Sequence, residues 1–362
     1  MEPDLPAPSK YLPLLEEIFE NGWYSNFGPL VRRFEEQLLA AIGAPEESCV
    51  TCSNATAGLS ASLIASGRTG EVLIPAFTFP ASLSAVRAAG MTEIIVDVNA
   101  DDWALGGDLL DRALAATGAG AVMLVAPFGM RRDLGPELAI CRKRGAAVVI
   151  DSASALGASR HDKSLGEGVF EVFSMHATKP FAVGEGGAIL AHRTHDSALR
   201  SALNFALNSH AEPGGPAWGF NGKMSEFHAA IGITQLSRIG DIVSRRQAFV
   251  SIYQDRLRQY PQLVCPQDTR CAPWQCFPIL LPNTATADRF VQNAAATGVE
   301  IRRYYSPSLS RWPNTRCFER CPVAEDLSGR MCALPVRALG SSSDAGKLSD
   351  LVLDALEQAL KL

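Results

Sequence analysis

Two side chains that could take part in acid–base or nucleophilic chemistry stand just after hydrophobic stretches of this sequence. Asp151 ends the apolar run AAVVID, and Lys179 follows the run VFEVFSMH by three residues. A buried carboxylate is costly unless it caps a helix or faces a cation. Burial lowers the pKa of a lysine amine and makes the amine nucleophilic. For either residue alone, the simpler alternatives are a helix-capping aspartate and a solvated lysine.

Two further segments place useful groups after an apolar run. The run SCVTC is followed by Ser53-Asn54-Ala55-Thr56, small and hydroxylated residues that open a helical stretch. Free N–H groups at a helix start bind anions, although a simple capped helix has the same pattern. Phe79 follows the run LIPA, where its ring could stack on a flat ligand or belong to the core. An amine, an acid, an anion site and a ring surface together are what pyridoxal phosphate (PLP) requires.

The elements that would position these groups alternate between strands and helices. Apolar, β-branched segments separated by helix-length segments predict an α/β fold with a mostly parallel sheet covered by helices on both faces. Ligands of such sheets bind at the carboxyl ends of the strands, which is where these groups lie. The seven strand candidates are Ser48–Cys52, Glu71–Ala76, Glu93–Val98, Gly120–Ala126, Ala146–Asp151, Val169–Met175 and Gly187–Ala191.

The sequence predicts two domains. Residues 1–235 would form a large cofactor-binding domain and residues 236–362 a smaller C-terminal α/β domain, while the N-terminal segment could pack on the small domain. A long charged helix from Ser225 to about Tyr260 would link the two, and an amphipathic helix, Leu348–Leu360, would follow near the C-terminus. Other helices are expected from about Gly28 to Gly43 and over Asn54–Ser66, Ala81–Ala89 and Leu134–Arg144.

The composition argues against several classes of function. A net charge of -5 and a pI near 5.8 disfavour a nucleic-acid-binding protein. The most apolar run, residues 119–128, is too short to cross a bilayer, and the N-terminus does not read as a secretory signal, so we expect a cytoplasmic protein without a membrane partner. Cys49 and Cys52 fall in an expected buried strand and are predicted to be core thiols. No metal site is expected, because no second pair of ligands has suitable spacing.

The order and spacing of several motifs resemble those of a known family. These are the DegT/DnrJ/EryC1/StrS aminotransferases, the sugar aminotransferase branch of the fold-type I PLP enzymes. The likeness extends over nearly the whole chain, and it includes the lysine that the dehydrating members of the family have lost. The matching segments are Gly22-Trp23, Phe27-Gly28-Pro29, Asn54–Leu59, Phe77–Phe79, Asp151–Ala158, Ser174–Lys179, Gly184–Gly187 and Asn221–Glu226.

The resemblance implies roles for several residues in holding PLP. Lys179 would form the Schiff base with the cofactor, Asp151 would pair with its pyridine nitrogen, and Phe79 would stack on its ring. Ser154 would lie near the ring and its phenolic oxygen. Asn221 would reach the cofactor of a second subunit, which implies a homodimer with shared active sites. The phosphate would be bound by Ala55, Thr56 and Ser174.

Less specific features provide candidate substrate contacts. Arg302, Arg303 and Tyr304 resemble the substrate-facing segment of the family, and two adjacent arginines could bind a diphosphate or a carboxylate. A solvated strand edge is the alternative interpretation of this segment. Ser25 and His176 are further candidates, His176 because it lies three residues before Lys179.

Three positions depart from the family pattern. Ser154 stands where the family usually has Gln or His, and its short side chain is expected to leave space for water or substrate. Ala55 replaces a glycine, which requires a negative φ at this residue. Lys223 replaces an arginine and therefore lacks the bidentate geometry of a guanidinium group.

The resemblance implies transfer of an amino group from an amino acid, most often glutamate, to a keto-sugar that is commonly nucleotide-linked. The main alternative is an aminotransferase of the same family that acts on a cyclitol or a polyketide-derived ketone, and a non-catalytic relative is another. A hydride-transfer enzyme is not supported, because the glycine pattern GxGxxG is missing. A cysteine desulfurase would have its His and Lys adjacent, whereas Ala177 and Thr178 separate them here.

Overall fold

The computed structural model describes residues 3–44, 46–158, 165–207, 215–268, 270–337 and 342–361. Its central element is a seven-stranded sheet with the strand order β1-β7-β6-β5-β4-β2-β3. Only β7 runs against its neighbours, and the other adjacent pairs are parallel, which confirms the predicted mostly parallel sheet. The strands are β1 (Glu47–Cys52), β2 (Glu71–Pro75), β3 (Thr92–Val96), β4 (Ala121–Val125), β5 (Ala147–Asp151), β6 (Val169–Ser174) and β7 (Gly187–His192).

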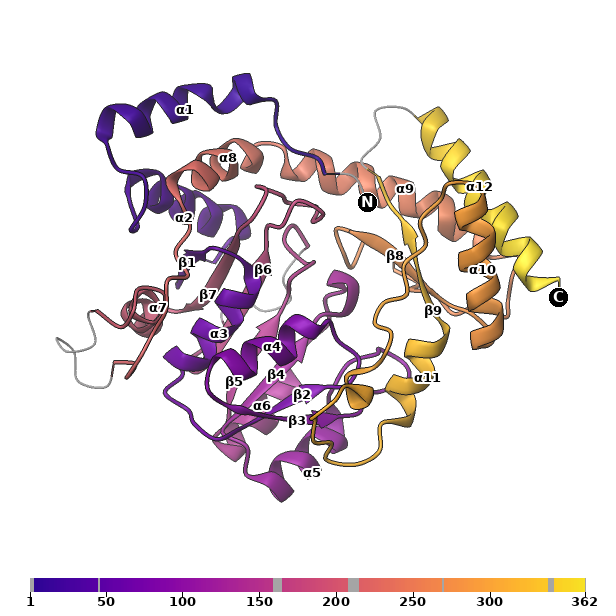
Figure 1. The fold of residues 1–362 in the computed structure, drawn as a ribbon, viewed down its shortest axis with the longest axis horizontal. Coiled ribbons are helices and arrows are strands. Elements are labelled where there is room, and N and C mark those ends of the chain that lie inside the picture. Colours follow the sequence, from indigo (N-terminus) through magenta and orange to yellow (C-terminus); the bar gives the residue numbers. More distant parts are fainter. Residues whose placement is uncertain are drawn as a thin grey trace.

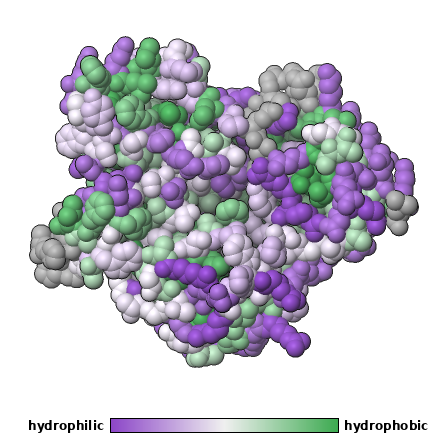
Figure 2. All heavy atoms as spheres, in the orientation of Figure 1, coloured by the Kyte–Doolittle hydropathy of each residue, from purple (hydrophilic) through white to green (hydrophobic). Residues whose placement is uncertain are grey.

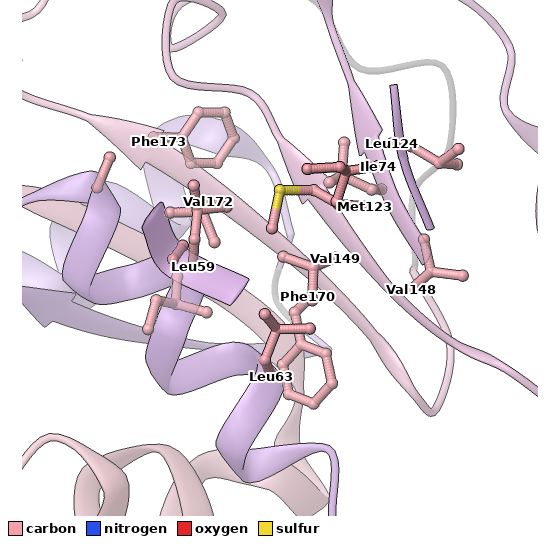
Figure 3. Packing of buried hydrophobic residues seen from close by; sticks show 14 of the residues in the cluster. Leu59, Leu63, Ile74, Met123, Leu124, Val148, Val149, Phe170, Val172 and Phe173 are labelled. Atoms are coloured by element: carbon pink, nitrogen blue, oxygen red, sulfur yellow. The ribbon is translucent and has the colours of Figure 1, made fainter. Parts of the chain in front are cut away.

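Helices pack on this sheet (Figure 1), and its apolar side chains are buried. α3 (Ala55–Ala65) and α4 (Pro80–Ala88) contact each other, as do α5 (Gly107–Thr117) and α6 (Gly135–Arg144). Leu59 and Leu63 of α3 lie close to Phe170 and Val172 of β6 in Figure 3. These residues belong to a large hydrophobic core, the main cluster, and its packing fixes the positions of the strand ends.

The start of each helix beside the site follows a local signal in the sequence. Asn54 caps α3, because its Oδ1 accepts a hydrogen bond from the N–H of Ala57 at 2.9 Å. The helix α2 (Pro29–Ile42) begins at a proline and ends before Gly43, which has a φ of 73°, as the sequence predicts. Glu226 caps α2 from a distant part of the chain, since its carboxylate accepts the N–H groups of Leu30 and Val31.

A second hydrophobic core, the second cluster, is formed by elements that lie beside the seven-stranded sheet in Figure 1. Its strands β8 (Cys276–Leu280) and β9 (Met331–Pro335) form an antiparallel pair. Trp274, Phe277 and Phe290 are among its large buried side chains. The helices around these two strands are α9 (Ile239–Leu257), α10 (Thr284–Ala296), α11 (Pro322–Arg330) and α12 (Ser342–Leu360). The position of the domain boundary, at residues 235 and 236, stays a prediction.

The predicted single helix from Ser225 to Tyr260 is wrong. The structure has two helices there, α8 (Glu226–Leu236) and α9, interrupted at residues 237 and 238. The Ser237 hydroxyl donates to the carbonyl of Thr234, and Arg238 binds the side chain of Gln235, so side chains compete with the helical backbone at this point. The break separates α8, which packs in the main cluster, from α9, which packs in the second cluster.

Both ends of the chain contain more helix than the sequence indicates. The helix α1 (Pro8–Asn21) was not predicted, because prolines dominate the first residues, but Pro8 occupies the tolerated first turn. α1 packs on α8, while Asp4 reaches the start of α9 and pairs with Arg238. The last helix, α12, begins at Ser342 rather than at the predicted Leu348.

The surface carries exposed hydrophobic side chains near α1. Figure 2 shows them gathered over the region where Figure 1 draws α1 and α2. Leu12 and Phe19 of α1 and Trp23 and Tyr24 after it are exposed. In the described parts of the chain, no helix is long and apolar enough to cross a membrane.

The nine cysteines are all free thiols. Cys49 and Cys52 of β1 are buried, as predicted for core residues, and burial raises the pKa of both thiols, that of Cys52 to about 12. The described residues contain no group of His, Cys, Asp and Glu side chains that could hold a metal ion.

Candidate active site

The carboxyl ends of the parallel strands open into a cavity of about 780 Å³. Its walls come from the turns that follow β1, β2 and β5, from the β6–β7 connection, and from two segments near the second cluster. This is the edge of the sheet at which the sequence predicts a ligand site. The predicted site residues that line the cavity are Ala55, Thr56, Phe79, Asp151, Ser154, Ser174, His176, Lys179 and Tyr304.

Three predicted site residues do not line this cavity. Asn221 is exposed, and the residue pairs through its backbone with Asn204, whose side chain accepts from Lys223 at 2.6 Å. Ser25 is half-buried in the loop before α2. Arg303 pairs with Asp288 at 2.5 Å and also binds the carbonyl of Gly329, so its guanidinium group is occupied by contacts within the fold.

Asp151 is the last residue of β5 and is buried. Its Oδ2 accepts from the Ser82 hydroxyl at 3.0 Å, and its Oδ1 accepts from the N–H of Ala153 at 3.1 Å. Burial raises the pKa of Asp151, although these two hydrogen bonds and the charge of Lys179 oppose that rise. A cation brought by a ligand would therefore favour the ionised form of this carboxyl group.

Lys179 lies in a tight connection between the antiparallel strands β6 and β7. The backbone N–H of Ala177 donates to Gly184, and that of Lys179 donates to His176, both at 2.8 Å. The residue is half-buried, because the cavity exposes one side of it. Burial lowers the pKa of the amine, and the charge of Asp151 opposes that effect. The neutral, nucleophilic form of the amine is therefore favoured relative to a lysine in water.

The amine of Lys179 makes two hydrogen bonds at the wall of the cavity. Nζ donates to Ser154 Oγ at 2.8 Å and to Gln275 Oε1 at 2.9 Å. The Gln275 side chain fills part of the space beside Ser154 and accepts from the Ser154 hydroxyl, while Ser154 also lines the cavity. The loop of Ser154 packs tightly, because a Cβ at Gly129, where φ is 83°, would lie 2.3 Å from the Ser154 carbonyl oxygen.

The start of α3 lies at the cavity and presents backbone N–H groups that can bind an anion. Ala55 and Thr56 are the first residues of the helix, so their N–H groups have no partner within it. Ser174 at the end of β6 faces the same space. The first residue of β7 lies close to the start of α3, since a Cβ at Gly187 would lie 2.9 Å from the Ala55 nitrogen. Ala55 is helical and its φ is not positive, which removes the conflict expected from replacing a glycine.

Aromatic rings form the opposite wall of the site. Phe79 is 52% exposed and meets the rings of Tyr304 and Tyr305 edge to face, both at 6.4 Å between centroids. Tyr305 also stacks on Phe128 at 5.6 Å. Arg302 lines the cavity beside them and donates to the Tyr304 hydroxyl at 3.0 Å. This wall offers flat apolar surface with the guanidinium group of Arg302, which also pairs with Glu300 at 2.8 Å, at its edge.

Sequence comparisons agree with this geometry. The model of the DegT/DnrJ/EryC1/StrS aminotransferase family matches residues 9–352. The chain belongs to this family. The dTDP-4-amino-4,6-dideoxy-D-glucose transaminase of Escherichia coli is 26% identical, with 97% of each chain covered. The GDP-perosamine synthase of Caulobacter vibrioides is 27% identical, with 99% of each covered. A crystal structure of DesI in the presence of its TDP-sugar product is 30% identical and superposes with a TM-score of 0.87, covering 99% of this chain and 93% of DesI.

The protein is thus an aminotransferase with the fold-type I architecture, as the motifs indicate. Its cavity contains Gln275, which the sequence did not bring to attention, and of the two adjacent arginines in the substrate-facing segment it is Arg302 that lines the cavity. Adjacent arginines give no local signal for which of them turns inward. Gln275 has no local signal either, because it is separated from Lys179 by 96 residues and approaches from the second cluster.

Proposed function

We propose that this aminotransferase uses PLP to move an amino group from an amino acid, with glutamate as donor, to the ketone of a nucleotide-linked sugar. One observation carries the proposal. The amine of Lys179, the carboxyl group of Asp151 and the start of α3 line one cavity, although they come from three different parts of the chain. These are the amine, acid and anion site that PLP requires.

The residues of the cavity fit the cofactor. Among the described residues, no basic side chain hydrogen-bonds to the buried carboxyl group of Asp151. A protonated pyridine nitrogen would be the cation that this group lacks. The first N–H groups of α3, with Ser174, would hold the phosphate, and Phe79 would contact the ring. When bound, PLP supplies an electron sink for the carbanion formed at the substrate carbon.

Lys179 would serve two purposes in this reaction. Its amine would attach the cofactor, and after release it would carry a proton between the substrate carbon and the cofactor carbon. A lowered pKa suits both tasks, because only the neutral amine can attack a carbonyl group or accept a proton. Asp151 would keep the pyridine nitrogen protonated throughout.

The mouth of the cavity supports an anionic acceptor. Arg302 and the Tyr304 hydroxyl lie beside Phe79, and this combination can bind a phosphate and contact a sugar or base. His176 and Glu185 also line the cavity, with 3.6 Å between His176 Nε2 and Glu185 Oε1. A volume of about 780 Å³ is within the usual range for small-ligand sites. The two relatives named above for dTDP- and GDP-linked sugars support the same class of acceptor.

Asn221 enters this proposal as a residue that acts on a second subunit. Its side chain is exposed and does not line its own cavity, as expected for a contact with a partner's cofactor phosphate. Exposed hydrophobic side chains such as Trp218 and Phe227 flank this segment in the sequence and could be covered in a homodimer. Mixed dimers can combine Asn221→Ala on one subunit with Lys179→Ala on the other. One intact site should remain, because the subunit that keeps Lys179 receives Asn221 from its partner. If each site used its own Asn221, no intact site would remain.

The central experiment is reduction of the PLP-loaded protein with borohydride, followed by peptide mapping. A pyridoxyl group on the peptide containing Lys179 is expected, and a label on another lysine would refute the assignment. The protein loaded with pyridoxamine phosphate should then regain the absorbance of the PLP form when a nucleotide-linked keto-sugar is added. Recovery only with cyclitol ketones or polyketide-derived ketones would show that the acceptor class is wrong.

A further inference from the structure

One polar side chain of the cavity comes from the segment that precedes β8. Gln275 is 7% exposed, and the preceding residue, Trp274, is buried within the second cluster. The carbonyl of Trp274 accepts from the guanidinium group of Arg246, a buried residue of α9, at 3.2 Å. The second cluster therefore holds the backbone from which Gln275 reaches into the cavity.

The amide oxygen of Gln275 joins Lys179 and Ser154 in a closed set of hydrogen bonds. Gln275 Oε1 accepts from Lys179 Nζ and from Ser154 Oγ, each at 2.9 Å. Lys179 Nζ also donates to Ser154 Oγ at 2.8 Å. The Ser154 hydroxyl thus donates its only hydrogen to Gln275 and accepts a hydrogen bond from the amine.

The other end of the Gln275 amide fixes its orientation. Nε2 donates to Thr178 Oγ1 at 3.0 Å. The Thr178 hydroxyl lies 2.9 Å from His176 Nδ1, which also accepts the backbone N–H of Thr178 at 3.3 Å. Because Nδ1 accepts from the backbone, it carries no proton, and the Thr178 hydroxyl must donate to it. The Thr178 oxygen is then free to accept from Gln275, so Oε1 is turned toward Lys179.

These contacts match the neutral form of the lysine amine. A neutral amine has two N–H bonds and one lone pair, and in the described part of the chain its two acceptors are Ser154 Oγ and Gln275 Oε1. Both N–H bonds are thereby directed at the wall, and the lone pair is left for an incoming carbonyl carbon. We propose that Gln275 is a positioning residue that holds the Lys179 amine in the orientation in which it reacts. The proposal rests on the role given to Lys179 above.

An amide suits this position because it accepts a hydrogen bond without adding charge. A carboxylate at the same distance would stabilise the protonated amine. The charge of Asp151 already acts in that direction, against the effect of burial. The titratable groups that face the amine or line the same cavity are Asp151 on β5, Cys276 on β8, His176 and Glu185 on the β6–β7 connection, and Arg302, Tyr304 and Tyr305.

The test uses the cofactor-free protein and the pH dependence of Lys179 labelling by trinitrobenzenesulfonate, read by mass spectrometry of the Lys179 peptide. In Gln275→Glu the midpoint of labelling should rise by about 1 to 3 pH units, because a carboxylate stabilises the ammonium form. In Gln275→Leu the midpoint should fall, because an acceptor for the ammonium form is lost. PLP uptake by Gln275→Leu, followed by absorbance, should slow by about tenfold, because the amine is no longer oriented.

A matched control is Gln247→Leu on α9. The Gln247 amide donates to the carbonyls of Arg270 and Ala272, so its loss disturbs the segment that carries Gln275 without changing the wall beside Lys179. This variant should label like the wild type. Wild-type midpoints in both Gln275 variants, or shifts of the same sign in both, would overturn the proposal. Circular dichroism establishes that each variant is folded.

The outcome is separable from that of the proposed function. If the wild-type protein takes up no PLP, the proposed function fails, whereas the labelling comparison still reports on Gln275. If PLP attaches to Lys179 but the pH midpoint of Lys179 labelling is the same in Gln275→Glu, Gln275→Leu and Gln247→Leu, only the role of Gln275 is refuted.

Discussion

Glu35 and Asp151 are both buried carboxyl groups, with 4% and 6% of their surface exposed, but their surroundings differ. Glu35 accepts the N–H and the hydroxyl of Thr51 at 2.8 and 2.9 Å and pairs with Arg200 at 2.8 Å. Asp151 accepts only from neutral groups, on Ser82 and Ala153, among the residues that the structure describes. Burial raises the pKa of both acids.

In the proposed function, the difference separates a structural acid, Glu35, from a functional one, Asp151. The chain itself supplies the cation beside Glu35, so neither the acid nor Arg200 is left as an unpaired buried charge, and Asp196 is a second partner of Arg200. Asp151 faces a cavity instead, and in the proposed function the bound cofactor would bring its cation. Removing the first acid should therefore reduce stability, and removing the second should reduce activity.

The largest expected effect is that of Asp151→Asn on activity. The turnover of the PLP-loaded enzyme should fall by about 10²- to 10³-fold, because a neutral amide cannot keep the pyridine nitrogen protonated. The urea unfolding free energy of the apoprotein should change by less than about 1 kcal/mol, since the Asn oxygen can accept from Ala153 and the Asn NH2 can donate to the Ser82 hydroxyl, which can then donate to Thr78. A large loss of stability with normal turnover would place Asp151 in the same class as Glu35.

Glu35→Gln should show the opposite pattern. The substitution leaves Arg200 largely buried with Asp196 as its remaining acidic partner, which should lower the unfolding free energy by about 3 kcal/mol in a urea titration. The turnover of the folded enzyme should stay within twofold of the wild type. The double variant Glu35→Leu with Arg200→Met should regain most of the stability, because no unpaired charge remains. Failure to regain it would mean that the pair itself is strongly stabilising.

Lys179 resembles Asp151 in that it lines the cavity and its burial lowers the stability of the apoprotein. A lowered pKa means that the folded apoprotein binds fewer protons than the unfolded chain at pH values between the lowered pKa and the ordinary value of 10.5. Stability should therefore rise with pH over that window. Urea titrations of wild-type apoprotein and Lys179→Met should show the variant to be more stable at the lower end, with the gap closing toward pH 10.5.

The smallest effects should separate two neighbouring arginines in the same way. Arg302→Met should raise the KM for the anionic acceptor by about tenfold with little change in stability, because this side chain lines the cavity. Arg303→Met should lower stability by about 1 kcal/mol and leave the KM unchanged, because it pairs with Asp288. Steady-state kinetics and urea titrations of both variants test this, and interchanged phenotypes would refute it.

Several features of this protein could be predicted because they depend on residues close together in the chain. Alternating apolar runs and helix signals predict the sheet and the cap at Asn54. Asp151 and Lys179 follow strands directly, so the fold class alone brings them to the same edge. The break between α8 and α9 could not be predicted, because each half follows the helical period and the interruption depends on local side-chain contacts and on separate packing in two cores.

The sequence by itself determines the family, the mostly parallel sheet and the identity of the amine, the acid and the helix start, since local patterns encode each of them. Only the tertiary structure decides that Gln275 lies against Lys179, that Arg302 rather than Arg303 faces the cavity, and that Glu35 pairs with Arg200 while no basic side chain among the described residues hydrogen-bonds to Asp151. The reason is that these contacts join residues far apart in the chain, and their geometry depends on how the second cluster packs beside the sheet.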